Sequence, residues 1–302
     1  MTVIFMGTPD YASSILKSLI NDHNINVAAV YTQPDKPVGR KKIMTPPPVK
    51  VLAQENGIEI YQPSRLRDEE VVSELLTIAC DYIVVAAYGQ ILPKAILDYV
   101  PCINLHASIL PQYRGASPIQ QSLLNGDKES GVTAMLMDVG LDTGDILKIE
   151  RITIDKDEML ETLFNRLTDV ASDLTLDVLK NFNTLSAIAQ DNDKATHCTK
   201  ITKADGQVRF DNATALYNRY RAFTPWPGVY LESGLKLKKI AFENAIVNNS
   251  SGKILSVDTD SIVVSTLEGS LRIFTVQPPS KKEMRVIDYL NGARLNCDDT
   301  LA

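Results

Sequence analysis

Short apolar runs alternate with amphipathic segments along the first half of the chain, and this alternation constrains the fold more than any other feature. Strand-like runs cover 3–6, 27–31 and 83–87, whereas apolar residues recur with helical spacing over 11–20 and 69–80. Parallel strands need crossover connections, so strands that alternate with helices favour a sheet covered by helices on both faces. The sequence therefore predicts an α/β fold whose N-terminal part is a Rossmann-like, doubly wound sheet.

A polar segment separates this part from a second region with a different periodicity. Residues 188–203 are mostly polar, and short strand-like runs divided by turn residues follow a single helical segment beyond them. Several short strands with turn signals favour a small β-barrel. We expect an N-terminal Rossmann-like domain over 1–187, a linker over 188–203, and a C-terminal OB-like β-barrel domain over 204–302.

Composition and local patterns argue against several classes of protein. No apolar run approaches the roughly 20 residues of a membrane helix, and residues 1–7 lack the basic start of a signal peptide. The first strand-like run is followed by no Gly-x-Gly-x-x-Gly, so we expect no dinucleotide cofactor. The four cysteines lie far apart, which favours free buried thiols in a reducing cytoplasm over disulfides or a zinc site.

Three polar residues stand out in apolar surroundings. Asn104 and His106 belong to a strand-like run and are two residues apart, so both side chains point to the same face of a strand. The run stops before Pro111, near the strand end where open α/β sheets bind ligands. Asp142 lies in a glycine- and aspartate-rich turn between two further strand-like runs. These residue types suit the transfer of an acyl group to an amine.

Each of these residues also has a structural interpretation. Asp142 could simply cap its turn, since aspartate is common there, and His106 could be a buried imidazole with its hydrogen bonds satisfied. The other two histidines, His23 and His197, lie in polar segments. Of the three histidines, only His106 is placed for chemistry.

A long basic segment follows the second strand-like run. Between residues 33 and 48 the chain carries four positive charges within seven residues, at Lys36, Arg40, Lys41 and Lys42. A charge run is usually a solvated surface, but a loop of this length in a compact domain is usually functional or disordered. Because it follows a strand on the ligand-binding side of the sheet, we expect it to contact nucleic acid.

Several motifs together resemble one family. The chain is similar to the methionyl-tRNA formyltransferase family, within the 10-formyltetrahydrofolate-dependent formyltransferases, in GTPD at 7–10, TQPDKP at 32–37, NLHASILP at 104–111, YRGASPI at 113–119, DVGLDTG at 138–144 and RAFTPWPG at 221–228. The Asn-x-His…Asp pattern alone indicates only the formyltransferase superfamily. The basic insert and the Pro-Trp-Pro-Gly segment narrow the resemblance to the methionyl-tRNA formyltransferase family.

The resemblance implies a reaction and its partners. A formyl group would pass from 10-formyltetrahydrofolate to the α-amino group of methionyl initiator tRNA, leaving tetrahydrofolate and needing no metal. We further expect a cytoplasmic monomer without a membrane partner. The first domain would be catalytic, and the C-terminal domain would bind tRNA.

The resemblance also implies site residues. Asn104, His106 and Asp142 would be catalytic, and the basic loop would reach the tRNA through Lys36, Arg40, Lys41 and Lys42. The folate would be bound by Ser108, Ile109, Leu110, Pro111, Tyr88 and Gly89.

The chemistry agrees with these roles. A free α-amino group has a pKa of about 8, so it must lose a proton as the new C–N bond forms, and histidine is a suitable base. Asn104 offers an N–H to the formyl oxygen, and one such donor contributes roughly 3–4 kcal/mol. Asp142 could orient His106 and stabilise its charged form, or act through a water molecule.

Two alternatives remain from the sequence. A formyltransferase acting on a small amine, such as glycinamide ribonucleotide or a nucleotide-linked amino sugar, would share the three catalytic residues but would not need the basic insert. A non-catalytic tRNA- or folate-binding protein would require the three residues to be incidental. Loss of turnover in His106→Ala would separate an enzyme from such a binding protein.

Overall fold

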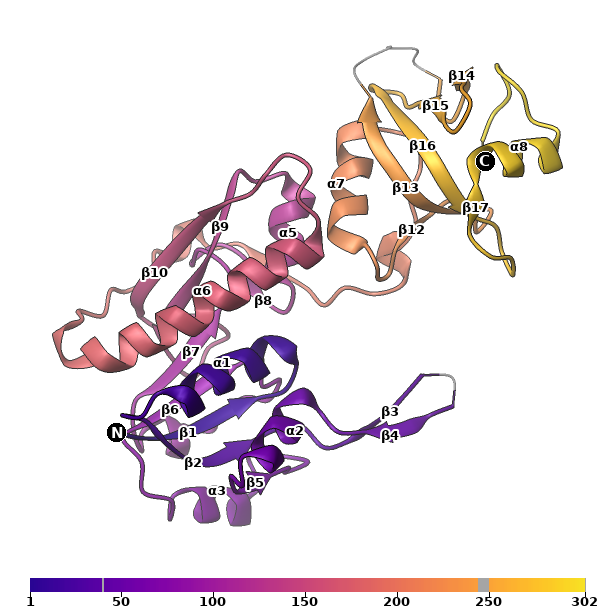
Figure 1. Ribbon diagram of the computed structural model, residues 1–302. Coiled ribbons are helices and arrows are strands. Elements are labelled where there is room, and N and C mark those ends of the chain that lie inside the picture. Colours follow the sequence, from indigo (N-terminus) through magenta and orange to yellow (C-terminus); the bar gives the residue numbers. More distant parts are fainter. Residues whose placement is uncertain (40, 244–249, 302) are drawn as a thin grey trace. The chain divides into compact units, whose positions relative to one another are not determined.

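The computed structural model describes residues 1–39, 41–243 and 250–301 (Figure 1). Contacts within the chain define two compact units. Unit 1 comprises Met1–Pro118, Glu129–Thr153 and Phe164–Cys198, and unit 2 comprises Ile119–Lys128, Ile154–Leu163 and Thr199–Ala302. The predicted linker, 188–203, leads from one unit to the other, and its first part is bound within unit 1.

Unit 1 is built on a seven-stranded sheet with the strand order β10-β9-β7-β6-β1-β2-β5. The strands are β1 (Thr2–Gly7), β2 (Asn26–Tyr31), β5 (Ile60–Tyr61), β6 (Tyr82–Ala86), β7 (Cys102–His106), β9 (Glu129–Leu136) and β10 (Ile146–Thr153). The first five run parallel to one another, whereas β9 pairs antiparallel with both β7 and β10. This confirms the predicted α/β fold with a Rossmann-like N-terminal sheet.

The helices of unit 1 pack apolar faces against this sheet. They are α1 (Asp10–Asn21), α2 (Pro48–Glu55), α3 (Glu69–Leu75), α4 (Lys94–Leu97) and the greater part of α6 (Leu160–Asn181). In α1, Tyr11, Ile15 and Leu19 recur at helical spacing and are buried, as an amphipathic helix requires. The helix predicted over 69–80 ends earlier, at Leu75. Its apolar pattern continues because Leu76 and Ile78 pack on the same core from an irregular segment.

The basic segment after β2 is a hairpin rather than the loop we predicted. Strand β3 (Lys36–Val38) pairs antiparallel with β4 (Ile43–Thr45), and every residue of both strands is exposed. Figure 1 shows this hairpin extending from the edge of unit 1. At its base, Lys50 Nζ and Gln62 Nε2 donate to Asp35 Oδ1 at 2.8 and 2.9 Å. The hairpin is therefore held to unit 1 at its base and exposed beyond it.

Unit 2 contains a six-stranded antiparallel sheet and three α-helices within the described residues. The strands are β12 (Val229–Tyr230), β13 (Lys236–Glu243), β14 (Ile254–Val257), β15 (Ile262–Ser265), β16 (Ser270–Gln277) and β17 (Met284–Arg285). The helices are α5 (Pro118–Asn125), α7 (Ala213–Phe223) and α8 (Val286–Ala293). The predicted C-terminal β domain is confirmed as this antiparallel sheet. Over the described parts of both units, no helix combines the length and apolar character that a membrane crossing requires.

Candidate active site

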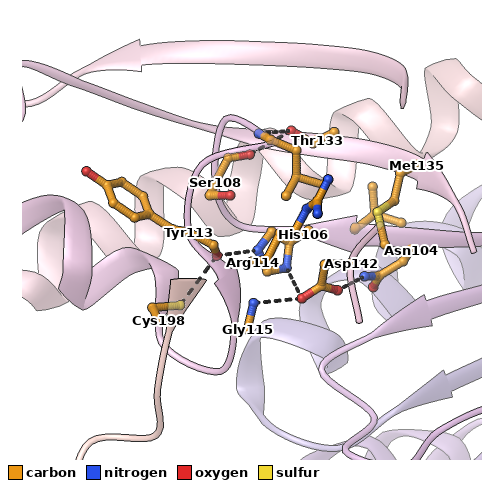
Figure 2. A network of polar contacts seen from close by, with 12 residues as sticks. Asn104, His106, Ser108, Tyr113, Arg114, Gly115, Thr133, Met135, Asp142 and Cys198 are labelled. Carbon is orange, nitrogen blue, oxygen red and sulfur yellow. Dashed lines mark hydrogen bonds and ion pairs between the residues drawn. The ribbon is translucent and has the colours of Figure 1, made fainter. Parts of the chain in front are cut away.

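The carboxylate of Asp142 lies between Asn104 and His106 (Figure 2). Asn104 Nδ2 donates to Asp142 Oδ1 at 3.3 Å, and His106 Nδ1 lies 3.7 Å from Asp142 Oδ2. Strand β7 carries Asn104 and His106 near its carboxyl end, and Asp142 comes from the turn between β9 and β10. Asn104 and His106 are only 8% and 7% exposed. The structure thus brings together the three residues predicted to be catalytic.

The hydrogen bonds of His106 identify which ring nitrogen carries a proton. His106 Nε2 lies 2.9 Å from the carbonyl oxygen of Tyr113. A carbonyl oxygen can only accept, so Nε2 holds the hydrogen in this contact, and in the neutral ring Nδ1 has the lone pair. The 3.7 Å from Nδ1 to Asp142 is too long for a hydrogen bond but suits an ion pair once Nδ1 gains a proton.

A second backbone segment orients the carboxylate. The amide of Gly115 donates to Asp142 Oδ2 at 2.8 Å. Gly115 has a φ of 121°, and a Cβ there would lie 2.2 Å from the carbonyl oxygen of Cys198. Only glycine therefore fits this position without displacing the backbone that binds Asp142.

The close approach at Gly115 comes from a pair of short strands that we did not predict. Strand β8 (Arg114–Gly115) pairs parallel with β11 (His197–Cys198). Thr196 continues the pairing, because its hydroxyl accepts from the Tyr113 amide at 2.9 Å and its own amide donates to Pro111. The segment predicted as a linker therefore holds the backbone that contacts His106 and Asp142.

Gln190 is the residue near the site that sequence reasoning missed most clearly. Its side-chain amide bonds both to the turn that carries Asp142 and to Arg114. It lies in a run of polar residues, Gln190 to Thr196, whose composition is that of a solvated linker. Only the similarity of the YRGASPI segment to a family motif pointed towards Arg114, and no pattern pointed to Gln190.

The residues predicted to bind folate occupy different environments. Ser108 is buried, its hydroxyl donates to Gln112 O at 2.6 Å, and its carbonyl accepts from Thr133 at 2.7 Å. Leu110 is buried, whereas Ile109 and Pro111 are half-buried. These four residues form the turn that follows β7 and begin two residues after His106.

The other two predicted folate residues lie after β6. The Tyr88 side chain belongs to the hydrophobic core, and its hydroxyl has no hydrogen-bond partner among the described residues. Its carbonyl accepts from Thr8 and Gln33 at 3.2 and 3.1 Å. Gly89 is exposed and has a φ of 81°. Only the backbone of this segment is therefore open to a ligand.

The residues predicted to bind tRNA lie on the hairpin. Lys36, Lys41 and Lys42 are exposed there, beside the exposed apolar side chains Ile43 and Met44. Arg40, the fourth residue of this prediction, lies outside the described residues. The hairpin thus presents three described cations away from the core.

All four cysteines are free, as predicted, but they differ in burial. Cys102 and Cys198 are buried, whereas Cys297 is exposed, so the expectation of burial was wrong there. Cys198 Sγ donates to the Tyr113 carbonyl at 3.4 Å, and burial raises the pKa of its thiol.

Within residues 1–39, 41–243 and 250–301, no group of three or more His, Cys, Asp and Glu side chains could hold a metal ion.

Comparisons with known proteins agree on the family. The "Formyl transferase" family matches residues 1–179, and the "Formyl transferase, C-terminal domain" family matches residues 200–294. A methionyl-tRNA formyltransferase of Sulfurimonas denitrificans is 64% identical over 302 residues, which cover 100% of both chains. Another, from a Nitratiruptor species, is 53% identical and covers 99% of both chains.

Solved structures share the fold at low identity. WlaRD, a sugar 3N-formyltransferase solved in the presence of dTDP and 5-N-formyl-THF, aligns with a TM-score of 0.68 at 18% identity, over 93% of this chain and 99% of its own. HypX of Aquifex aeolicus in complex with tetrahydrofolic acid aligns with a TM-score of 0.61 at 13% identity, over 99% of this chain and 48% of its own. At these identities the likeness concerns the fold.

Proposed function

The chain belongs to the methionyl-tRNA formyltransferase family, and we propose that Asn104, His106 and Asp142 carry out the reaction of that family. The enzyme transfers the formyl group of 10-formyltetrahydrofolate to the α-amino group of methionyl initiator tRNA. The product is N-formylmethionyl-tRNA, which is used to initiate translation. The folate supplies a formyl group already activated for transfer to an amine.

One observation supports the catalytic assignment above all others. A single carboxylate, that of the half-buried Asp142, contacts both Asn104 and the Nδ1 of His106. An amide and an imidazole fixed on one carboxylate provide a hydrogen-bond donor and a proton acceptor side by side, and acyl transfer to an amine needs both.

His106 accepts the proton of the attacking amine at Nδ1. The Tyr113 carbonyl fixes the hydrogen on Nε2, so Nδ1 has the lone pair before the reaction. When Nδ1 gains the proton, the ring becomes a cation 3.7 Å from the Asp142 carboxylate. At this separation in a buried site the charges attract strongly, so Asp142 stabilises the protonated base directly.

Asn104 binds the formyl oxygen. Its Nδ2 has two hydrogens, and the bond to Asp142 uses one of them. The second hydrogen is available to an oxygen on which negative charge develops. Because Asp142 fixes the amide before the substrate arrives, little reorganisation is needed during the reaction.

The turn after β7 forms part of the folate site. Ser108 uses its hydroxyl and its carbonyl within the turn, so it holds the shape of the turn. The half-buried side chains of Ile109 and Pro111, together with the backbone of Gly89, are then the groups that meet the folate, and the buried Leu110, whose amide donates to Thr133 Oγ1 at 3.1 Å, supports them from within the turn. Tyr88 acts through its backbone, because its side chain lies in the core.

The hairpin binds tRNA through its cations. Lys36, Lys41 and Lys42 are exposed, and lysines that contact phosphates contribute affinity that salt weakens. Arg40 belongs to the same proposal by its place in the sequence.

We also propose that the enzyme acts as a monomer in the cytoplasm, with a catalytic domain at 1–187, a linker at 188–203 and a tRNA-binding domain at 204–302.

A single-turnover experiment tests the role of His106. His106→Ala should lower the rate of formyl transfer by about 10²- to 10⁴-fold, because general-base catalysis contributes about that factor. Binding of methionyl-tRNA should not change. His23→Ala is the matched control, since His23 is exposed in a turn after α1. A turnover close to that of the control would exclude His106 as the base.

A further inference from the structure

Gln190 bonds at the same time to two segments that meet at Asp142. Its Nε2 donates to the carbonyl oxygens of Asp142 and Gly144 at 2.9 and 2.7 Å. Its Oε1 accepts from Nε and Nη2 of Arg114 at 3.0 and 2.8 Å. All four hydrogen-bonding positions of this amide are therefore used in tying the two segments together.

The partners also determine the orientation of the amide. Carbonyl oxygens only accept and a guanidinium only donates, so Nε2 must face the turn and Oε1 must face Arg114. Arg114 is 4% exposed, and its Nη2 donates further to Asn192 Oδ1 at 2.9 Å. The guanidinium thus anchors the amide by two bonds to one oxygen.

Both segments held by Gln190 act on the carboxylate of Asp142. One is the turn that contains Asp142 itself, where φ is 55°, a left-handed conformation that surrounding contacts must maintain. The other is the backbone after Arg114, where the Gly115 amide donates to Asp142 Oδ2. The distance between the carboxylate and His106 therefore depends on the bonds that Gln190 makes.

We propose that Gln190, anchored by Arg114, is a positioning residue that holds the Asp142 carboxylate against Asn104 and His106. This inference rests on the proposed catalytic role of Asp142. The segment before β11 is then part of the catalytic apparatus and does more than connect two domains. Misplacement of a catalytic group by about 1 Å can cost about 10²-fold in rate, so the loss of these bonds should be visible in turnover.

Two substitutions separate positioning from folding. Gln190→Ala removes all four bonds and should lower kcat about 10- to 100-fold without changing KM for methionyl-tRNA. Gln190→Glu keeps an acceptor for Arg114 but cannot donate to the carbonyls of Asp142 and Gly144. It should lower kcat as well, while its melting temperature stays at or above that of Gln190→Ala.

A control substitution elsewhere in unit 1 removes an amide that, like that of Gln190, donates two hydrogen bonds. Asn181 Nδ2 donates to Asp177 O and Asp177 Oδ1 at 3.0 and 2.9 Å at the end of α6. Asn181→Ala should leave kcat unchanged even if it lowers the melting temperature. A fall in kcat that tracked melting temperature in all three variants would mean that Gln190 only stabilises the fold, which would overturn the inference.

The decisive measurement repeats Gln190→Ala and Gln190→Glu in an Asp142→Asn background. If Gln190 acts through Asp142, both substitutions should change kcat far less there than in the wild type, because coupled residues are not additive. Equal fold-losses in the two backgrounds would overturn the inference and leave the catalytic role of Asp142 intact. A wild-type kcat in Asp142→Asn itself would instead refute the proposed function of Asp142, and with it the inference.

Discussion

Asn104 provides the sharpest test of how the catalytic residues act together. Asn104→Ala removes the donor proposed for the formyl oxygen, and the loss of one such donor costs about 2.7–4 kcal/mol, or about 10²–10³ in kcat. Asn104→Asp keeps the shape of the side chain but replaces the donor with an acceptor. It places a second carboxylate where Asn104 Nδ2 now lies 3.3 Å from Asp142 Oδ1.

Because Asn104→Asp adds a negative charge, it should lower the rate of formyl transfer more than Asn104→Ala does. At 3.3 Å and an effective dielectric constant of about 20, two carboxylates repel by roughly 5 kcal/mol, which favours a shared proton at neutral pH. Sharing that proton weakens the negative charge that stabilises protonated His106. We therefore expect Asn104→Asp to lose the donor and part of the effect of Asp142, and to be slower than Asn104→Ala.

The assay is single-turnover formyl transfer at saturating folate and methionyl-tRNA, with melting temperatures measured in parallel. Asn104 is buried, so a residue that served packing alone would tolerate the isosteric aspartate better than alanine. A rate for Asn104→Asp at or above that of Asn104→Ala, in folded protein, would refute the argument from charge.

Three further predictions concern other parts of the chain. Replacing the three described hairpin lysines by glutamine (Lys36, Lys41 and Lys42) should raise KM for tRNA and flatten its dependence on salt, with the slope falling by up to about 0.7–0.9 for each lysine that binds a phosphate; an equal loss of folate affinity would contradict the assignment of the hairpin. Burial raises the pKa of the Cys102 thiol to about 12, so iodoacetamide at pH 8 should modify exposed Cys297 first and Cys102 only on unfolding. Mass spectrometry of the labelled peptides measures this order, and labelling of Cys102 before Cys297 would contradict the prediction. Hydrogen bonds from Gln62 and Lys50 lower the pKa of Asp35, so its stabilising effect is full above the unfolded pKa of about 3.9 and is lost as the pH falls through the folded value; unfolding titrations should show Asp35→Asn less stable than wild type at pH 7 and the gap closing below pH 4, and a gap constant with pH would count against this linkage.

Local patterns predicted the elements that carry the catalytic residues. The spacing of two between Asn104 and His106 follows from strand geometry, and a glycine-rich turn is a strong local signal for the segment around Asp142. Their meeting depends on the antiparallel pairing of β7 with β9, which no local pattern contains. The sequence grouped Asn104 and His106 with Asp142 in one site only through the resemblance to family motifs, and periodicity did not show that they meet.

The features that the sequence did not predict are those that lack a regular alternation of apolar and polar residues. Strands β3 and β4 are exposed on every side, so no burial pattern marks them. The segment around Gln190 is polar because its side chains bind buried backbone groups, and a solvated linker would have the same composition. Sequence composition cannot separate these two cases, because both require polar residues.

The central claim is tested most directly by offering three acceptors in parallel with 10-formyltetrahydrofolate. The acceptors are methionyl initiator tRNA, glycinamide ribonucleotide and a nucleotide-linked amino sugar, and each is assayed with wild-type enzyme and with His106→Ala. We predict formyl transfer to the charged tRNA alone, and its loss in the variant. Transfer to a small amine with none to the tRNA, or undiminished transfer by His106→Ala, would contradict the account.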